Sequence, residues 1–262
     1  AGNAQMAAYY DEHHAVLRGV LYREDVPVIS VPDPAGVRVG NGGAVGNTLL
    51  WMRDHLPELQ ERYPHLQGRA LHDLRIVIIQ AGGFGTRYTP GSSDGSKTLM
   101  RLPMRLANGD LMTTMDFVLQ GAYKFTQALS AHGQGGLAVL NGDGLLLTEP
   151  KLADGISLIT NPESIQEAAG KLGVVVIDPG TRRVRIFLER PDRATMRVHP
   201  DLGFVLFSVE VIRQLDTNTA SYIVTHRDPE TYQDFLNAYL TINGLLRQRL
   251  ETGRAVYEID TS

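Results

Sequence analysis

The chain has 262 residues, of which 43% are hydrophobic and 21% are charged, and its formal net charge is −4. These values are typical of a globular protein with an ample core, and they exclude a global attraction to nucleic acid or to an anionic membrane. The absence of cysteine excludes disulfides, thiolate nucleophiles and cysteine-bound zinc. Because no apolar run reaches about 18 residues and no signal-like segment is present, we expect a cytoplasmic protein without a membrane partner. The start at Ala1, without methionine, leads us to expect a processed or trimmed product.

A helix, an extended segment and a glycine-rich loop are expected at the N-terminal end. Apolar spacing predicts a helix over residues 4–21 and an extended segment over 27–31. The loop at 33–44 then runs into a second helical stretch through Leu49 and Leu56. Its glycines would expose backbone N–H groups at the N-terminus of that helix, which suits an anion or the edge of a base. A helix-capping loop accounts for the same glycines equally well.

The most informative segment joins an apolar strand to a second glycine-rich loop. The strand is expected over residues 74–80, and it leads into Ala-Gly-Gly-Phe-Gly-Thr-Arg. Gly82, Gly83 and Gly85 remove side chains that would keep backbone N–H groups away from a polyphosphate. Arg87 adds a permanent charge that can bind two phosphate oxygens at once. This pattern indicates a phosphate site.

A second cation, Lys97, follows Arg87 after ten residues. Three alternatives to this interpretation are a dinucleotide-binding fingerprint, a P-loop and a plain strand-to-helix turn. A dinucleotide-binding fingerprint needs a third glycine, which is missing here, and a P-loop needs its lysine one residue earlier and a strand that feeds the loop. A plain strand-to-helix turn accounts for one glycine pair, but it does not account for the accompanying Arg87 and Lys97.

A candidate metal ligand follows the next strand. Apolar residues at helical spacing predict a helix over 115–129, and a strand is expected over 137–140. That strand leads directly into Gly142 and Asp143. Open α/β sheets bind ligands at the carboxyl ends of their strands, and Mg²⁺ prefers carboxylate ligands. We therefore expect Asp143 to bind Mg²⁺, although turn propensity alone would also place an aspartate between two glycines.

The remaining chain is expected to complete an α/β sheet. The sequence predicts strands over 173–177 and 183–188 around a tight turn, a strand over 203–208, a helix over 229–250 and a strand over 254–259. Strands that alternate with helices indicate a mainly parallel sheet, and the central hairpin makes it mixed. We expect a single domain over 1–262, with an N-terminal region at 1–70 and a core at 71–262.

The phosphate-loop motifs resemble the signature of the sugar-phosphate nucleotidyltransferases, or NDP-sugar pyrophosphorylases: Gly-Gly-Phe-Gly-Thr-Arg, a spacer, a lysine and Leu-Pro. The resemblance implies a glycosyltransferase-A-like, Rossmann-type three-layer sandwich with a mainly parallel, mixed sheet. It also implies Mg²⁺ as cofactor and Arg87, Lys97 and Asp143 as catalytic residues. The implied substrate contacts in the phosphate loop are Ala81, Gly82, Gly83, Gly85 and Thr86.

Two later segments resemble the same family. Glu189-Arg190-Pro191 is similar to a Glu-Lys-Pro motif whose lysine grips the sugar phosphate, so the resemblance implies Glu189 and Arg190 as substrate contacts. The segment around Asp260 resembles a strand-borne motif that supplies the second metal ligand; a terminal acidic residue without function is the alternative. We also assign Gly203, at the start of an expected strand, to substrate binding.

The N-terminal loop narrows the resemblance. Asp-Pro-Ala-Gly followed by Val-Gly-Asn-Gly-Gly-Ala is similar to the N-terminal region of fucose-1-phosphate guanylyltransferases and of the nucleotidyltransferase half of bifunctional fucokinases. The segment Tyr-Gln-Asp-Phe-Leu at 232–236 adds to this similarity. Other pyrophosphorylases hold the nucleobase with a Gly-x-Gly-Gly loop, so the resemblance implies that Gly40, Asn41, Gly42 and Gly43 contact the base.

These features together predict an enzyme that joins an NTP and a sugar 1-phosphate and releases pyrophosphate. GTP and a fucose-like or other deoxy- or heptose 1-phosphate are the favoured substrates. The alternatives are a UTP-dependent hexose or N-acetylhexosamine 1-phosphate uridylyltransferase and a non-catalytic homologue that binds nucleotide-sugar. A glycosyltransferase would usually carry an Asp-x-Asp motif, which the sequence lacks. The eight histidines are expected to be structural, and the sequence does not indicate an oligomeric state.

Overall fold

A computed structural model describes about two thirds of the chain. The described residues are 4–34, 40–81, 99–131, 135–142, 155–158, 161–163, 165–171, 173–178, 180–181, 183–188, 190–198, 209–212, 222–225, 230, 232–234, 236–238 and 240–241. The chain divides into two compact units. The first unit comprises Ala1–Gly155 and Val224–Ser262, and the second comprises Ile156–Ile223.

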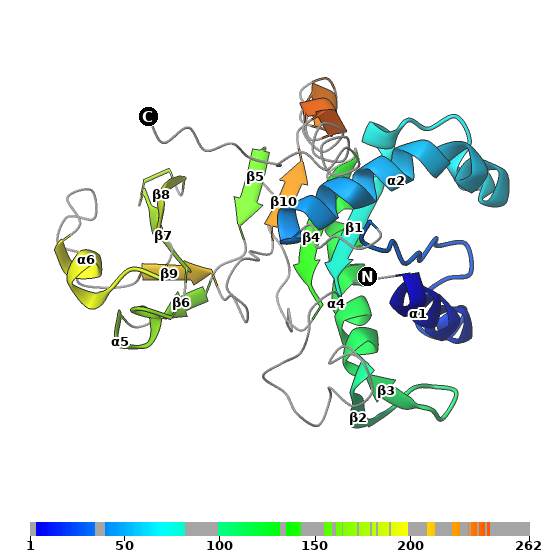
Figure 1. Cartoon of the computed structure of the whole chain (residues 1–262), viewed down its shortest axis with the longest axis horizontal. Helices are drawn as coiled ribbons and strands as arrows, with labels where there is room; N and C mark the ends of the chain where they lie inside the picture. Colours follow the sequence, from blue (N-terminus) through cyan, green and yellow to red (C-terminus); the bar gives the residue numbers. More distant parts are fainter. Residues whose placement is uncertain are drawn as a thin grey trace. The chain divides into compact units, whose positions relative to one another are not determined.

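Helices form most of the N-terminal part of the first unit (Figure 1). Helix α1 spans Ala4–Leu17 and α2 spans Gly40–Arg62, and the short 3-10 helices η1 and η2 span Pro64–Leu66 and Leu71–Asp73. The predicted first helix was too long at its C-terminal end. It stops at Leu17 because Gly19 adopts a φ of +78°, a left-handed conformation that ends a helix and that glycine tolerates without strain.

A small parallel sheet lies at the centre of the first unit. Strand β1 spans Arg75–Gln80 and β4 spans Gly136–Asn141, which confirms two predicted strands. They pair in parallel from Arg75 with Gly136 to Gln80 with Asn141. The strand order is β1-β4-β10-β5, where β10 spans Tyr222–Thr225 and β5 spans Gly155–Leu158. The sequence boundaries between the two units fall within β5 and β10. The side chains of Leu137–Leu140 are at most 1% exposed, as expected for a parallel strand covered on both faces.

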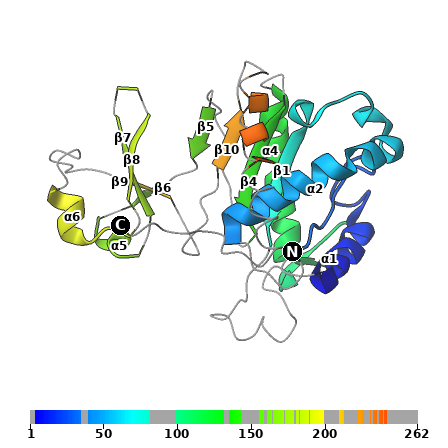
Figure 2. The ribbon, with the colours of Figure 1, turned by 45° about the horizontal axis from the view of Figure 1, so that its top comes forward.

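Helices cover both faces of β1 and β4. Helix α2 crosses in front of the two strands and α4, Thr114–Ala131, runs behind them (Figures 1 and 2). The predicted apolar face of α4 is confirmed, because its apolar residues at helical spacing are buried: Met115, Val118, Ala122, Phe125 and Leu129. Val45, Leu49 and Leu50 of α2 are buried on the other side. These layers form the core that supports the carboxyl ends of β1 and β4.

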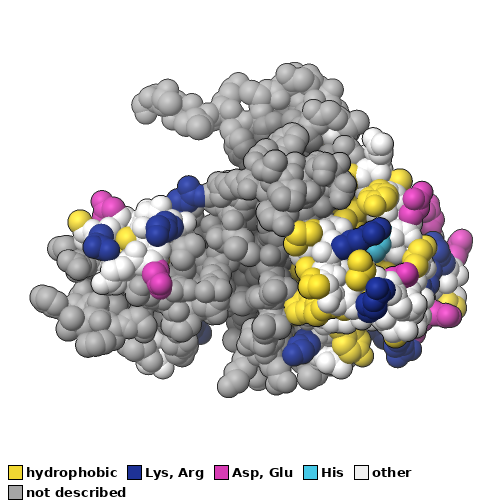
Figure 3. Space-filling model, turned by 90° about the horizontal axis from the view of Figure 1, so that it is seen from below, with side chains coloured by type: hydrophobic (Ala, Val, Ile, Leu, Met, Phe, Trp, Pro, Cys, Tyr) yellow, Lys and Arg dark blue, Asp and Glu magenta, His cyan; other side chains and the backbone are white. Residues whose placement is uncertain are grey.

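An unpredicted hairpin stands between β1 and α4. Strands β2, Arg101–Arg105, and β3, Leu111–Thr113, pair antiparallel around a turn in which Gly109 has a φ of +91°. Leu106 and Met112 form a buried cluster with Leu17 of α1. Two apolar side chains of the hairpin, Met104 and Leu111, are exposed. Figure 3 shows one face of the molecule, on which apolar side chains are interspersed with Lys and Arg.

The second unit contains an antiparallel sheet. It comprises β6, Asn161–Glu163, β7, Gly173–Ile177, β8, Val184–Leu188, and β9, Val209–Ile212, in the order β6-β9-β7-β8, with short helices α5, Ile165–Ala168, and α6, Arg193–Val198. The predicted β7–β8 hairpin is confirmed, but it lies in this separate antiparallel sheet and not, as expected, in the sheet that contains β1 and β4. Its turn closes through the carboxylate of Asp178, which accepts hydrogen bonds from the backbone N–H groups of Gly180 and Thr181 at 3.0 and 2.8 Å.

The described elements form an α/β fold with a small parallel sheet, which is compatible with a Rossmann-like arrangement. Described residues between 230 and 241 are helical, in agreement with the predicted helix at 229–250. The predicted strands at 203–208 and 254–259 lie outside the described residues. No helix among the described residues is long and apolar enough to span a membrane.

Candidate functional site

The site begins where β1 and β4 end. The backbone N–H of Gly142 donates a 3.0 Å hydrogen bond to the carbonyl oxygen of Gln80. A Cβ on Gly142 would lie 2.6 Å from that oxygen and 3.0 Å from the Cα atom of Ala81. Because any larger residue would meet the backbone of the neighbouring strand end, glycine is required here by close approach.

This pairing brings together the starting points of two predicted motifs. Gly82 follows Ala81 in the chain, and Asp143 follows Gly142. The phosphate-loop motif and the Gly-Asp motif therefore leave the sheet from adjacent positions on its carboxyl edge. Open α/β sheets bind their ligands at this edge. The sequence predicted both strands, but only the parallel register shows that the two motifs start side by side.

The other end of the same strand pair is equally tight. A Cβ on Gly135 would overlap the carbonyl oxygen of His72, and the backbone N–H of Gly136 donates to the carbonyl of Leu74 at 3.0 Å. Glycine therefore allows close packing before and after β4. The register that aligns the two motifs is fixed at both ends of the strand.

Helix α1 reaches the start of the phosphate loop through Tyr10. Its hydroxyl donates to the carbonyl oxygen of Ala81 at 3.4 Å, and the residue is 2% exposed. The ring stacks against His14, one helical turn away, with ring centroids 6.4 Å apart and planes inclined by 19°. Sequence reasoning missed Tyr10, because nothing local marks a contact between residues 71 positions apart in the chain.

A short polar contact joins α1 to the N-terminus of α4. His13 Nε2 lies 2.8 Å from Asp116 Oδ1, and the Asp116 side chain is fully buried. The other carboxylate oxygen accepts a 2.6 Å hydrogen bond from the backbone N–H of Thr113, while the Asp116 N–H donates to the Thr113 hydroxyl at 3.2 Å. Burial alone would raise the pKa of Asp116, but the hydrogen bonds from His13 and Thr113 outweigh it and lower this pKa.

The two reciprocal hydrogen bonds between Thr113 and Asp116 form a capping box at the start of α4. The pattern Thr-x-x-Asp before an apolar run could have revealed this from the sequence. His13 itself carries no such signal. What the structure shows for His13 is its contact with Asp116, between α1 and the first turn of α4.

His14 lies in the same junction and is buried. Burial and, to a smaller extent, the neighbouring His13 lower its pKa to about 4, although the carboxylates of Asp11 and Asp116 oppose this change. Its Nδ1 atom is buried without a hydrogen-bond partner among the residues that the structure describes. His14 is therefore held neutral at physiological pH.

The predicted nucleobase loop lies at the beginning of α2. The helix starts at Gly40, so Gly40, Asn41, Gly42 and Gly43 form its first turn. This confirms that these residues stand at a helix N-terminus, where backbone N–H groups lack partners within the helix. Farther along α2, the Asn47 side chain donates to the carbonyl of Pro32 at 2.9 Å. This bond fixes the chain that leads toward the helix.

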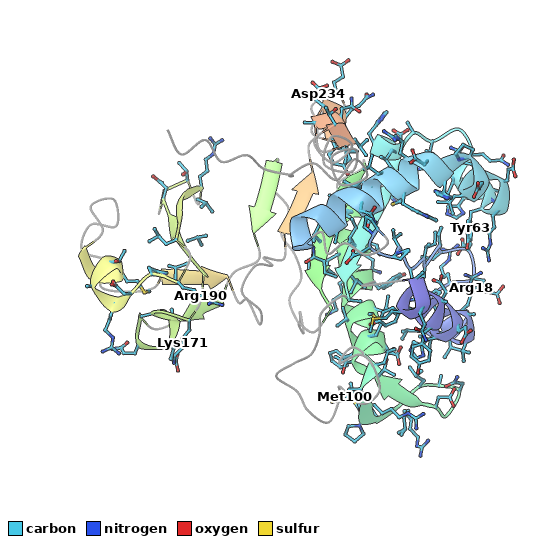
Figure 4. All side chains as sticks on the ribbon, viewed as in Figure 1. Arg18, Tyr63, Met100, Lys171, Arg190 and Asp234 are labelled. Atoms are coloured by element: carbon cyan, nitrogen blue, oxygen red, sulfur yellow. The ribbon has the colours of Figure 1, made fainter. Side chains whose placement is uncertain are left out.

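Arg190 belongs to the second unit and has an unusual backbone. Its side chain is labelled in Figure 4. The residue is exposed, and its φ is +45°. A left-handed conformation is uncommon for arginine, and a residue before proline normally favours extended backbone. The following Pro191 is buried, and its carbonyl oxygen accepts a 2.8 Å hydrogen bond from the backbone N–H of Gly170. The strained position is therefore anchored immediately after Arg190.

The other predicted site residues lie outside the described residues: Gly82, Gly83, Gly85, Thr86, Arg87, Lys97, Asp143, Glu189, Gly203 and Asp260. The expected proximity of Asp143 and Asp260 therefore stays a prediction. Within the described ranges, the structure contains no group of three or more His, Asp or Glu residues that could hold a metal ion.

Comparison with known proteins shows the family to which the chain belongs. The sequence model of the Fucose pyrophosphorylase domain matches residues 68–258. The chain belongs to the fucose pyrophosphorylase family. It is 28% identical over 166 residues to the bifunctional fucokinase/GDP-fucose pyrophosphorylase of Arabidopsis thaliana. This match covers 56% of the chain but only 15% of that protein. No solved structure is significantly similar to the chain.

Membership of the fucose pyrophosphorylase family supports a sugar-1-phosphate nucleotidyltransferase in general terms. The matched range contains β1, β4 and every predicted site residue from Ala81 to Gly203. It leaves out the first turn of α2 and Asp260. Helix α1, which contacts Ala81, also precedes the matched range.

Proposed function

We propose that the chain transfers a nucleotidyl group from an NTP, with GTP favoured, to a sugar 1-phosphate and releases pyrophosphate. The observation that carries this proposal is the contact between the ends of β1 and β4, where Gly142 donates to Gln80. Because of this contact, the glycine-rich phosphate motif and the Gly-Asp motif begin at adjacent positions. Membership of the fucose pyrophosphorylase family supports the same reaction class.

The reaction needs positive charge more than covalent chemistry. A sugar phosphate oxygen attacks the α-phosphorus of the NTP, and the bond to the pyrophosphate leaving group breaks. We assign Arg87 and Lys97 to the NTP phosphates, where fixed cations offset the charge that develops. We assign Asp143 and Asp260 as ligands of Mg²⁺. When bound, this ion would offset negative charge on the phosphoryl oxygens. The position of Gly142 on the carboxyl edge of the sheet fits this role for Asp143.

The substrate contacts follow from the same proposal. We assign the first turn of α2, residues 40–43, to the nucleobase and Arg190 to the sugar phosphate. A fucose-like sugar is favoured because the family and the Arabidopsis thaliana relative are both described as fucose or GDP-fucose pyrophosphorylases. We further propose that both compact units belong to one glycosyltransferase-A-like nucleotidyltransferase domain.

The test is pyrophosphate release from a matrix of GTP, UTP, ATP and CTP against fucose 1-phosphate, mannose 1-phosphate, glucose 1-phosphate and N-acetylglucosamine 1-phosphate. We expect the highest kcat/KM with GTP and fucose 1-phosphate and none without Mg²⁺. Preference for UTP would replace the guanylyl assignment. Binding of a nucleotide-sugar without turnover of any pair would indicate the non-catalytic homologue.

A pair of matched variants tests the metal assignment in that assay. Asp143→Asn should lower kcat by about two orders of magnitude or more while the protein still folds, because only the charge of the ligand is removed. Asp110→Asn is the control, since Asp110 is exposed in the β2–β3 turn. Equal activity of both variants at saturating Mg²⁺ would remove Asp143 from the site.

A further inference from the structure

We infer that Tyr10 is a positioning residue for the phosphate loop, so that α1 is part of the nucleotide-binding machinery. This inference rests on the proposed function. It assigns a role to a segment that the family match does not reach, because α1 ends at Leu17 and the match begins at residue 68.

The Tyr10 hydroxyl contacts the chain at the entrance to the phosphate loop. It donates to the carbonyl of Ala81, the last described residue before Gly82. That carbonyl belongs to the peptide unit that also contains the N–H of Gly82. Because a peptide unit is planar, a hydrogen bond to its carbonyl oxygen restrains the rotation of the whole unit. Glycine at position 82 makes such external support more important, because the residue has little conformational preference of its own.

Helix α1 also contacts described residues that precede and follow the segment 82–98 in the chain. On one side Tyr10 bonds to Ala81. On the other side Leu17 packs against Leu106 and Met112 of the β2–β3 region, which directly follows that segment. One short helix therefore holds the chain before and after the motif that contains Arg87 and Lys97.

The same helix is firmly attached to the rest of the first unit. His13 pairs with the fully buried Asp116 at 2.8 Å, and the Tyr22 hydroxyl donates to the carbonyl of His14. The Tyr10 ring is enclosed by the core and stacks on His14. A hydroxyl held in this way is pre-organised, so the bond to Ala81 costs little additional ordering.

The chain offers a matched pair of variants for the test. Tyr10→Phe deletes the hydroxyl and keeps the ring, whereas Tyr9→Phe makes the same change at a neighbouring tyrosine that is 55% exposed. Hydrogen exchange is measured for the backbone amides of residues 76–82 and for Gly142, whose N–H bonds to Gln80. Kinetics are measured for both variants with GTP, fucose 1-phosphate and Mg²⁺.

We expect Tyr10→Phe to accelerate exchange at Gly82 and Gly142 about fivefold or more, while Tyr9→Phe matches the wild type. We expect kcat to fall about threefold to tenfold with a smaller change in the KM for fucose 1-phosphate. The melting temperature should fall by less than about 4 °C. A purely structural role would lower the melting temperature without changing kcat.

Unchanged exchange in Tyr10→Phe, or a kcat within about twofold of the wild type, would overturn the inference. If the wild type turns over no NTP and sugar 1-phosphate, the proposed function fails, and the exchange rates at Gly82 and Gly142 alone decide whether Tyr10 positions the loop. The two failures are therefore distinguishable.

Discussion

The backbone N–H of Gly142 is hydrogen-bonded to the carbonyl oxygen of Gln80 at 3.0 Å, where two parallel strands end together. Substitution of Gly142 by alanine should disturb this contact, because the added Cβ would lie 2.6 Å from the oxygen. We expect a loss of about 1–3 kcal/mol in the free energy of unfolding, as in other overpacked sites. We also expect the affinity for MgGTP to fall about tenfold, because both loop starts must shift.

The control for this substitution is Gly180→Ala in the β7–β8 turn. There the nearest atom to a new Cβ would be the Asp178 Oδ1 atom at 3.5 Å, an ordinary contact distance. Urea unfolding and a nucleotide titration on both variants check the prediction. A Gly142→Ala protein with wild-type stability and affinity would show that the strand ends tolerate separation.

Loss of the Asp116 carboxylate should destabilise the junction between α1 and α4. Asp116→Ala removes the contact with His13 and the bond from the Thr113 backbone, and it leaves both donors poorly satisfied. We expect a cost of about 2–3 kcal/mol. Chemical denaturation measures it, with the exposed Asp110→Ala as a control that should stay within about 0.5 kcal/mol of the wild type.

A double-mutant cycle separates the contribution of the His13–Asp116 contact from that of the helix cap. His13→Ala should cost less than Asp116→Ala, because the capping bonds from Thr113 remain. We expect a coupling of about 0.5 kcal/mol or more between His13 and Asp116. Strict additivity of the two substitutions would mean that the 2.8 Å contact contributes nothing to stability.

His14 should make the protein less stable in mild acid. Burial lowers its pKa from 6.5 to about 4, so the folded protein takes up this proton less readily than the unfolded chain does. The stabilisation is complete above pH 6.5 and is lost as the pH falls from 6.5 towards 4, by about 3 kcal/mol at most. The effect should appear as a decrease in the urea midpoint between about pH 7 and about pH 4.5.

The variant that checks this assignment is His14→Phe, which keeps an aromatic ring beside Tyr10 and cannot be protonated. It should flatten the dependence of stability on pH in that window. His65→Gln, at an exposed position, should leave the dependence unchanged. An unaltered slope in His14→Phe would assign the acid sensitivity to other groups.

Arg190 should control the affinity for the sugar phosphate. If its guanidinium binds the phosphate, Arg190→Ala should raise the KM for fucose 1-phosphate about tenfold to a hundredfold, because a charged hydrogen bond is lost. Arg190→Lys should recover part of that affinity, since the lysine keeps the charge but lacks the two-pronged geometry. Steady-state kinetics with varied sugar phosphate measure the effect.

Arg193, exposed at the start of α6, provides the matched control. Arg193→Ala should leave the same KM within about twofold of the wild type. Equal KM values for Arg190→Ala and Arg193→Ala would assign the left-handed backbone at Arg190 to the local turn rather than to substrate binding.

The sequence by itself determined the elements whose burial pattern is local. Met115, Val118 and Ala122 repeat at helical spacing, and this local pattern predicts both α4 and its buried face. The same is true of β1, of β4 and of the β7–β8 hairpin, whose turn carries its own Asp-Pro-Gly signal. The motifs that indicate phosphate chemistry are also local, because they occupy short runs of the chain.

The tertiary structure decided everything that depends on distant partners. The β2–β3 hairpin was missed because its strand residues are mostly exposed and do not alternate, and because Pro103 lies within β2. The pairing of Gln80 with Gly142, the bond from Tyr10 to Ala81 and the contact of His13 with Asp116 leave no trace in local periodicity. They depend on strand register and helix packing, which are set by the energy of the whole fold rather than by neighbouring residues.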